Sequence, residues 1–193
     1  METYLRKMKD EWAQLISDTQ PQVRLLAAGI ANEHAQLLSQ EFYSVVLNDG
    51  QAAEFLTNDQ VEKQLKSALE QWIIDVFSCQ VEGVDEQIQV QQRVADVHAR
   101  IGIPVDLVEM GFRVLKKLLF PVISASAHSP EMKLDVYHFA INSIDLAMEV
   151  MSRAFIFSEN SAAKEDENYR IFSLLENGEE EKERQIASLL TWE

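Results

Sequence analysis

Glycine and proline are sparse in this chain, and the segments between them are long. The 193 residues include six glycines and four prolines. The intervening segments carry apolar residues at spacings of three and four, which place those residues on one face of an α-helix. No pair of segments shows the alternation that is typical of strands. The sequence therefore predicts an all-α fold.

The composition is that of a folded domain with a core of its own. Apolar residues make up 47% of the chain and charged residues 25%, as in ordinary globular proteins. A chain of this length buries roughly 70% of the surface that its unfolded form exposes, so it needs no disulfide or structural metal. The single cysteine, Cys79, permits no internal disulfide, and no signal-peptide pattern opens the chain. We therefore expect a reducing, cytoplasmic location.

The net charge of −15 at pH 7 bears on the kind of partner. Nucleic acids and anionic membranes are also negatively charged, so we expect neither as a partner of this surface. The longest apolar region, 105–123, is interrupted by charged residues such as Glu109 and Arg113. It falls short of the roughly 20 apolar residues of a transmembrane helix, so we expect no membrane span.

Turn and capping residues divide the chain into a series of predicted helices. Pro21, Asn58 and Pro104 each stand where a helix can begin, and Gly83 separates two helices. The expected helices cover about 2–17, 21–47, 58–80, 84–100, 104–124 and 130–157. Pro121 should kink the fifth of these helices or end its regular part.

The composition changes after Phe157. Residues 158–193 carry ten acidic and four basic side chains, and a linker of Ser, Asn and Ala precedes a second charged helix. We therefore expect a domain over 1–157 and an acidic linker with the start of a helical transmitter over 158–193. Heptad positions in that tail fit a coiled coil, and a solvated amphipathic helix fits them equally well. Because the chain ends inside an apolar helical pattern, we expect it to be part of a longer protein.

His98 has the most apolar surroundings of the four histidines. Val94, Val97 and Ile101 stand at i−4, i−1 and i+3 from it. A neutral imidazole at this position would lie against an apolar cavity near the end of a helix. The same pattern is also typical of a core histidine, so periodicity leaves both interpretations open. His34, His128 and His138 lie in a turn or at ordinary helical positions, where ligation is not expected.

Common active-site motifs are missing from the sequence. It contains no phosphate-binding GxxxxGK[ST] loop, no dinucleotide-binding GxGxxG and no GxSxG nucleophile elbow. A di-iron carboxylate site needs two Glu-x-x-His pairs, and the nearest match is the single pair Asp135 and His138. Cys79 has no neighbouring Cys or His with which to bind zinc. We therefore expect no conventional active site in this chain.

Haem is the cofactor that these residues suit best, because it needs one axial nitrogen and an apolar slot. Tyr43, preceded by Phe42, is the candidate for the opposite wall, since a phenol can donate a hydrogen bond to a bound gas. The helix that follows supplies an apolar face for the rest of that wall. Leu65, Ala68 and Leu69 belong to this face. The face could equally be ordinary core.

Three parts of the chain resemble the globin-coupled sensor family. The run VADVHARIGIP over 94–104, followed by VEMGFR over 108–113, resembles the proximal helix and the next helix of that family. The tripeptide EFY over 41–43 resembles its distal motif. Residues 164–176 look like the start of the middle region in enterobacterial oxygen-sensing diguanylate cyclases of this family.

The resemblance implies a globin fold that binds haem b. In it, His98 is the proximal iron ligand, Tyr43 forms a hydrogen bond to bound dioxygen, and Leu65 helps to exclude water from the distal side. Carbon monoxide and nitric oxide are further ligands of such a site. Some relatives carry a hydroxyl residue where this chain has Ala68, so we expect no second distal hydrogen bond. The cofactor-binding residues on this basis are His98, Tyr43, Phe42, Leu65, Ala68, Leu69 and Val94.

The resemblance also implies partners. In longer relatives the haem state controls a C-terminal cyclase that makes cyclic di-GMP, and no Gly-Gly-Asp-Glu-Phe motif occurs here. We therefore expect a sensor without catalytic activity of its own. Dimeric sensors of this family pair through their last two globin helices. A seam of mostly small residues on the last helix is the expected homodimer surface, which Ala147→Glu should disrupt. The alternative is a helix that is buried on both sides within one subunit. Its members are Val136, Ala140, Ser143, Ala147, Val150, Ala154 and Phe157.

Two other functions fit parts of the same pattern. A cofactor-free helical dimerisation or regulatory domain would use His98 and Tyr43 as core residues. A haem enzyme that oxidises nitric oxide or cleaves peroxide is the other possibility, and no second distal histidine or arginine is evident to support peroxide cleavage. An absorption spectrum separates the cofactor-free function from the other two.

Overall fold

The computed structural model describes residues 2–56 and 64–176, and side chains over 3–56 and 64–158. Every regular element within these residues is a helix, which confirms the predicted all-α class. The chain divides into two compact units, Met1–Phe155 and Ile156–Glu193. The expected helix cap at Asn58 lies outside the described residues.

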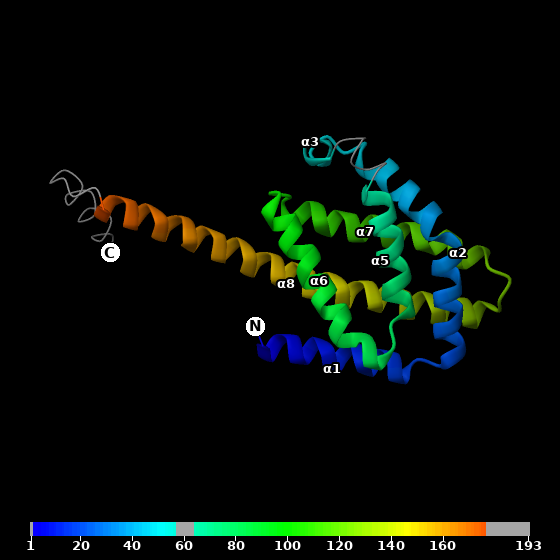
Figure 1. Cartoon of the computed structure of the whole chain (residues 1–193). Helices are drawn as coiled ribbons and strands as arrows, with labels where there is room; N and C mark the ends of the chain where they lie inside the picture. Colours follow the sequence, from blue (N-terminus) through cyan, green and yellow to red (C-terminus); the bar gives the residue numbers. More distant parts are fainter. Residues whose placement is uncertain (1, 57–63, 177–193) are drawn as a thin grey trace. The chain divides into compact units, whose positions relative to one another are not determined.

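The helices follow one another with short connections (Figure 1). Their bounds are α1 Glu2–Asp18, α2 Pro21–Val46, α3 Ala52–Phe55, α5 Lys66–Ser78, η2 Val81–Gly83, α6 Val84–Arg100, α7 Val105–Ala125 and α8 Pro130–Glu176. A π-helical turn at residues 64–65 precedes α5. The sequence did not predict the one-turn helix α3, because four residues carry too little periodicity to recognise.

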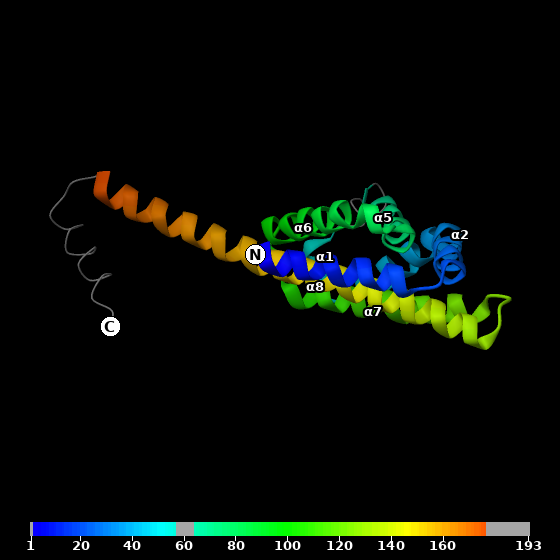
Figure 2. The same ribbon diagram turned by 90° about the horizontal axis from the view of Figure 1, so that it is seen from below.

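The first helix, α1, buries one stripe of large side chains. Met8, Trp12 and Ile16 follow at intervals of four residues and are at most 1% exposed. α1 runs alongside the part of α8 in the same unit (Figure 2), where the Tyr4 hydroxyl donates to the Glu149 carbonyl oxygen at 3.0 Å. α1 therefore packs its apolar stripe into the core of the first unit.

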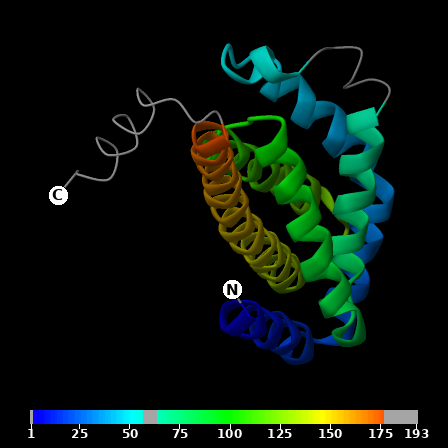
Figure 3. The same cartoon turned by 60° about the vertical axis from the view of Figure 1, so that its left-hand side comes forward.

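The next helices form the frame around the candidate site. α2 packs against both α5 and α7. The Ser39 hydroxyl on α2 is fully buried and donates to the Lys66 carbonyl oxygen at 2.9 Å. α5 and α6 meet at the short η2 helix, and their other ends lie apart (Figures 1 and 3). Leu65 and His98 both lie toward these separated ends.

Two expected interruptions of helices are not present. α7 continues through Pro121 to Ala125. α8 continues through 158–163, where we expected a linker, to Glu176. That stretch contains neither glycine nor proline and includes two alanines, the strongest helix former, so nothing in it breaks the backbone hydrogen-bond ladder.

The small-residue seam of α8 is buried inside the first unit, so the prediction that it forms the dimer surface is wrong. Small side chains allow close packing of helices within one protomer as well as between two. The six members that lie within this unit are at most 5% exposed: Val136, Ala140, Ser143, Ala147, Val150 and Ala154. The seventh, Phe157, lies in the second unit.

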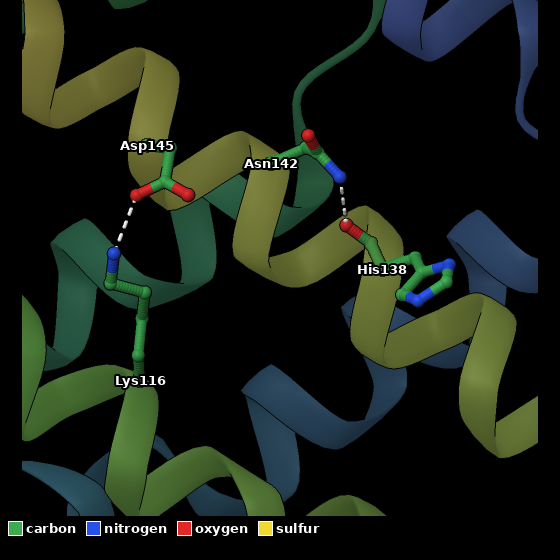
Figure 4. A network of polar contacts seen from close by, with 4 residues as sticks. All are labelled: Lys116, His138, Asn142 and Asp145. Carbon is green, nitrogen blue, oxygen red and sulfur yellow. Dashed lines mark hydrogen bonds and ion pairs between the residues drawn. The ribbon is translucent and has the colours of Figure 1, made fainter.

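The solvent side of α7 and α8 carries a different apolar surface. Phe120 and Leu134 are 57% and 54% exposed. The Phe120 ring packs edge-on against Tyr137, with ring centroids 5.6 Å apart. Elsewhere on the same two helices, Lys116 on α7 and Asp145 on α8 form an ion pair at 2.5 Å (Figure 4). This outer surface joins the two helices across their exposed sides.

Candidate functional site

His98 lies in the last turn of α6, and its backbone surroundings fix its tautomer. Its Nδ1 lies 2.7 Å from the carbonyl oxygen of Val94. A carbonyl oxygen can only accept, so Nδ1 carries the proton and donates it. In the neutral ring Nε2 then holds an unprotonated lone pair. Nε2 has no partner among the described residues, and it is available to a metal.

The end of α6 closes directly on His98. The Ile103 N–H donates to the His98 carbonyl oxygen at 3.1 Å, and the Gly102 N–H donates to that of Ala99 at 3.1 Å. This pair of bonds is a Schellman cap, which requires a residue with positive φ. Gly102 supplies it with φ of 76°. The cap therefore holds both the carbonyl group of His98 and the turn that follows this residue.

Apolar side chains beside His98 are open to solvent. Val97 and Ile101 are 51% and 55% exposed, whereas the sequence pattern predicts an apolar cavity beside His98. Two cavities in the described fold lie elsewhere: one between α1 and α6 beside Lys9, and one between the α1–α2 turn and α8 beside His138. An apolar group bound at His98 would cover the exposed side chains.

Tyr43 lies near the end of α2 and faces the start of α5. It is half-buried, and burial raises the pKa of its phenol to about 12. The phenol is therefore protonated and able to donate near neutral pH. It donates to the Leu65 carbonyl oxygen at 3.3 Å, which is a long hydrogen bond. Tyr43 and Leu65, both predicted for the distal side, are thus in contact.

Phe42 positions this part of α2 against α7. Its ring lies edge-on to that of Tyr43, with centroids 5.0 Å apart and an interplanar angle of 88°. On the other side it approaches Gly111 so closely that a Cβ there would lie 3.2 Å from Phe42 Cζ. Gly111 thus leaves room for Phe42, a role that the sequence pattern alone did not assign.

The remaining predicted residues lie on the facing helices. Leu69 and Val94 are half-buried, whereas Ala68 is exposed. Leu65 is half-buried at the beginning of α5. The structure brings Phe42, Tyr43 and Leu65 together. It also brings His98 and Val94 together on α6. Among the described residues, no hydrogen bond joins this pair to Phe42, Tyr43 or Leu65.

The site fits one haem by the chemistry of its donors. A single imidazole presents a free Nε2, exposed apolar side chains flank it, and a protonated phenol lies beside the facing helix. These are the requirements for an axial ligand, an apolar contact surface and a hydrogen-bond donor for a gas. We expect His98 to hold the iron and the residues of α2 and α5 to cover the opposite side.

One connection between α5 and α6 was missed from the sequence. The Trp72 indole N–H on α5 donates to the Gln91 side-chain oxygen on α6 at 2.9 Å. The signal that could have revealed it is the placement of glutamines at positions 87 and 91, on the same helical face as His98. Periodicity of apolar residues does not report such polar pairs.

The chain is similar to known proteins along its whole length. The family model described as Protoglobin matches residues 9–161. "Diguanylate cyclase DosC" of Shigella flexneri serotype 5b (strain 8401) is 66% identical over 193 residues, covering 100% of this chain and 51% of that protein. The protein of the same name from Escherichia coli (strain K12) is 65% identical, covering 100% of this chain and 42% of that protein. The chain thus spans about half the length of these curated relatives, or less.

Solved structures extend the comparison to the fold. The globin domain of E. coli DosC, in a ferric and a ferrous form, is 61% identical with a TM-score of 0.75, covering 76% of this chain and 99% of that chain. The globin domain of a Geobacter sulfurreducens globin-coupled sensor is 20% identical with a TM-score of 0.63, covering 78% of this chain and 96% of that chain. The second match bears on the fold alone.

These similarities confirm the predicted globin fold and the resemblance to diguanylate cyclases with a globin sensor domain. They do not favour the cofactor-free alternative. Ferric and ferrous forms of a globin imply haem iron as the cofactor of this fold. Among the described residues, no helix is both long and apolar enough to cross a membrane. With 9–161 matched by the family model, the chain belongs to the protoglobin family.

Proposed function

We propose that this chain is a haem-based dioxygen sensor domain. The observation that carries the proposal is the hydrogen bond from His98 Nδ1 to the Val94 carbonyl oxygen at 2.7 Å, which leaves Nε2 free for a metal. The proposed cofactor is haem b, which supplies a ferrous iron that binds diatomic gases reversibly. The other described histidines have no comparable combination of an apolar setting and a fixed tautomer.

The residues around His98 divide the work of holding cofactor and gas. His98 Nε2 would hold the haem iron, and the bond to the Val94 carbonyl oxygen fixes the direction of the imidazole ring. Tyr43 would donate a hydrogen bond to dioxygen in place of its long bond to the Leu65 carbonyl oxygen, and the new bond would be charge-assisted. The apolar side chains Phe42, Leu65, Ala68 and Leu69 complete the distal surface and exclude water. Carbon monoxide and nitric oxide fit the same space.

The partners that we propose follow from the relatives and from the outer surface of α7 and α8. Residues 1–157 form the sensor, and 158–193 begin the transmitter to a cyclase in a longer cytoplasmic protein. The chain itself carries no catalytic role. A second copy packs on the outer surface around Phe120 and Leu134, so that the last two globin helices form the dimer. The net charge of the chain, −15, disfavours nucleic acid as a partner.

The test is the visible absorption spectrum after addition of haem. We expect the parent protein to show a Soret band and a five-coordinate ferrous form. His98→Ala should lose haem or retain it weakly, because its only proposed axial nitrogen is gone. His138→Ala is the matched control, since His138 is exposed on α8 and its carbonyl oxygen accepts from Asn142 (Figure 4). A normal ferrous spectrum in His98→Ala, or no Soret band in the parent, would contradict the proposal.

A further inference from the structure

Two glutamines are buried on the face of α6 that carries His98. Gln91 is fully buried and Gln87 is 6% exposed. Intervals of four and seven residues separate Gln87 from Gln91 and Gln91 from His98, so all three side chains lie on one face of the helix. A buried amide without partners is costly. Their presence in the interior therefore depends on hydrogen bonds within the protein.

Trp72 supplies the partner from the facing helix. Its indole nitrogen lies 2.9 Å from Gln91 Oε1, and Gln91 Nε2 lies 3.1 Å from Gln87 Oε1. An indole N–H only donates, so the Gln91 oxygen must face Trp72 and its amide nitrogen must face Gln87. The chemistry thus fixes the orientation of the Gln91 amide.

Trp72 is itself held at a junction of three helices. Its ring packs edge-on against Phe112 of α7, with centroids 5.8 Å apart. It follows Leu65 by seven residues on the distal face of α5. α5 and α6 share an end at η2 and separate toward their other ends (Figures 1 and 3). The bond from Trp72 to Gln91 links the two helices between these ends.

We propose that Trp72 and Gln91 are positioning residues for His98. Their hydrogen bond fixes the rotation of α6 about its axis and its separation from α5. Because α6 is continuous from Val84 to Arg100, a rotation at Gln91 is carried seven residues along the same face to the imidazole. This inference rests on the proposed role of His98 as the axial ligand.

The experiment compares variants of the haem-loaded protein. Gln91→Leu removes the acceptor, and Trp72→Phe removes the donor while keeping an aromatic ring against Phe112. We expect each to shift the iron–histidine stretching band in the resonance Raman spectrum and to speed haem loss about tenfold to a hundredfold. Combining the two should add little, because both break the same bond. Gln89→Leu on the exposed side of α6 is the control and should match the parent.

A conservative variant and an apoprotein measurement separate positioning from general stability. In Gln91→Glu, burial raises the pKa of the carboxyl group, and the neutral acid can accept from Trp72 and donate to Gln87. We expect the iron–histidine stretching band of this variant to match that of the parent. A purely structural role would lower the urea midpoint of the apoprotein and leave the band in place, which would overturn the inference. A parent protein without the band would overturn the proposed function as well; a parent with the band and an unchanged Gln91→Leu would overturn the inference alone.

Discussion

At the scale of single residues, the proposed role of Tyr43 gives its phenol two competing acceptors, the Leu65 carbonyl oxygen and a bound gas. Tyr43 donates to the Leu65 carbonyl oxygen across 3.3 Å, longer than the usual 2.7–2.8 Å for a hydroxyl donor. A bond of this length is weak enough to exchange for a better acceptor. Dioxygen bound at a haem carries partial negative charge, whereas carbon monoxide is far less polar. In the proposed sensor, this difference in polarity makes dioxygen a better acceptor for Tyr43 than carbon monoxide.

This difference predicts the behaviour of Tyr43→Phe. The variant should keep haem but release dioxygen faster by about tenfold to a hundredfold, which corresponds to a charge-assisted hydrogen bond of about 1.5–3 kcal/mol. Carbon monoxide dissociation should change little. Stopped-flow measurement of both gases tests this, with Tyr137→Phe on α8 as the control. Equal changes for both gases would return Tyr43 to a role in the core.

Ser143 offers a residue-scale test of the core itself. Its hydroxyl is fully buried on α8 and has no hydrogen-bond partner among the described groups. Removing an unsatisfied buried hydroxyl relieves a cost, so Ser143→Ala should raise the free energy of unfolding by about 1 kcal/mol. Urea denaturation of the apoprotein measures it. A loss of stability would show that the hydroxyl is satisfied in solution.

At the scale of elements, local signals in the sequence predict the helix that carries His98. α6 has the predicted bounds of 84–100, because Gly83 and Gly102 flank a well-patterned segment. By contrast, the break expected after Phe157 is missing from α8, since a change in composition is not a change in helix propensity. Side-chain polarity alone did not reveal the Trp72–Gln91 pair, because its partners are 19 residues apart and meet through tertiary packing.

The candidate site shows the same division between local and tertiary information. The pairing of His98 with Val94 follows from helical spacing. The contact between Tyr43 and Leu65 depends on how α2 meets α5, which periodicity does not report. The sequence predicts that the small-residue seam of α8 is an apolar face. It does not tell whether the helix that covers this seam belongs to the same protomer.

The Schellman cap of α6 predicts opposite effects for two glycines. Gly102→Ala should lower the free energy of unfolding by about 1 kcal/mol, because φ of 76° strains a residue with a Cβ. Gly29→Ala should raise it by up to about 1 kcal/mol, since Gly29 is exposed within α2 and a Cβ there meets nothing within 4 Å. Thermal unfolding of both variants checks the pair; equal signs would contradict the cap.

At the scale of the whole molecule, the small-residue seam and the outer surface have different roles. The buried seam bears on folding, and the exposed outer surface bears on association. Ala147 is fully buried, so Ala147→Glu should unfold the domain, because it buries an unpaired carboxylate. Phe120 is 57% exposed, so Phe120→Glu should preserve the helical circular dichroism and dissociate the proposed dimer. Sedimentation velocity combined with circular dichroism distinguishes the two. A folded dimeric Phe120→Glu protein would move the interface away from the outer surface.

The position of α1 has a consequence for the order of events during synthesis. Its hydroxyl contact from Tyr4 reaches a residue 145 positions later, and its Lys9 pairs with Asp85, 76 positions later. A ribosome adding about 5–20 residues per second separates the emergence of Tyr4 from that of Glu149 by roughly 7–30 s. During that interval the apolar stripe of α1 lacks part of the packing that buries it in the folded unit. α1 is thus synthesised well before the residues that it contacts on α6 and α8, so its apolar stripe stays exposed in the nascent chain for that time.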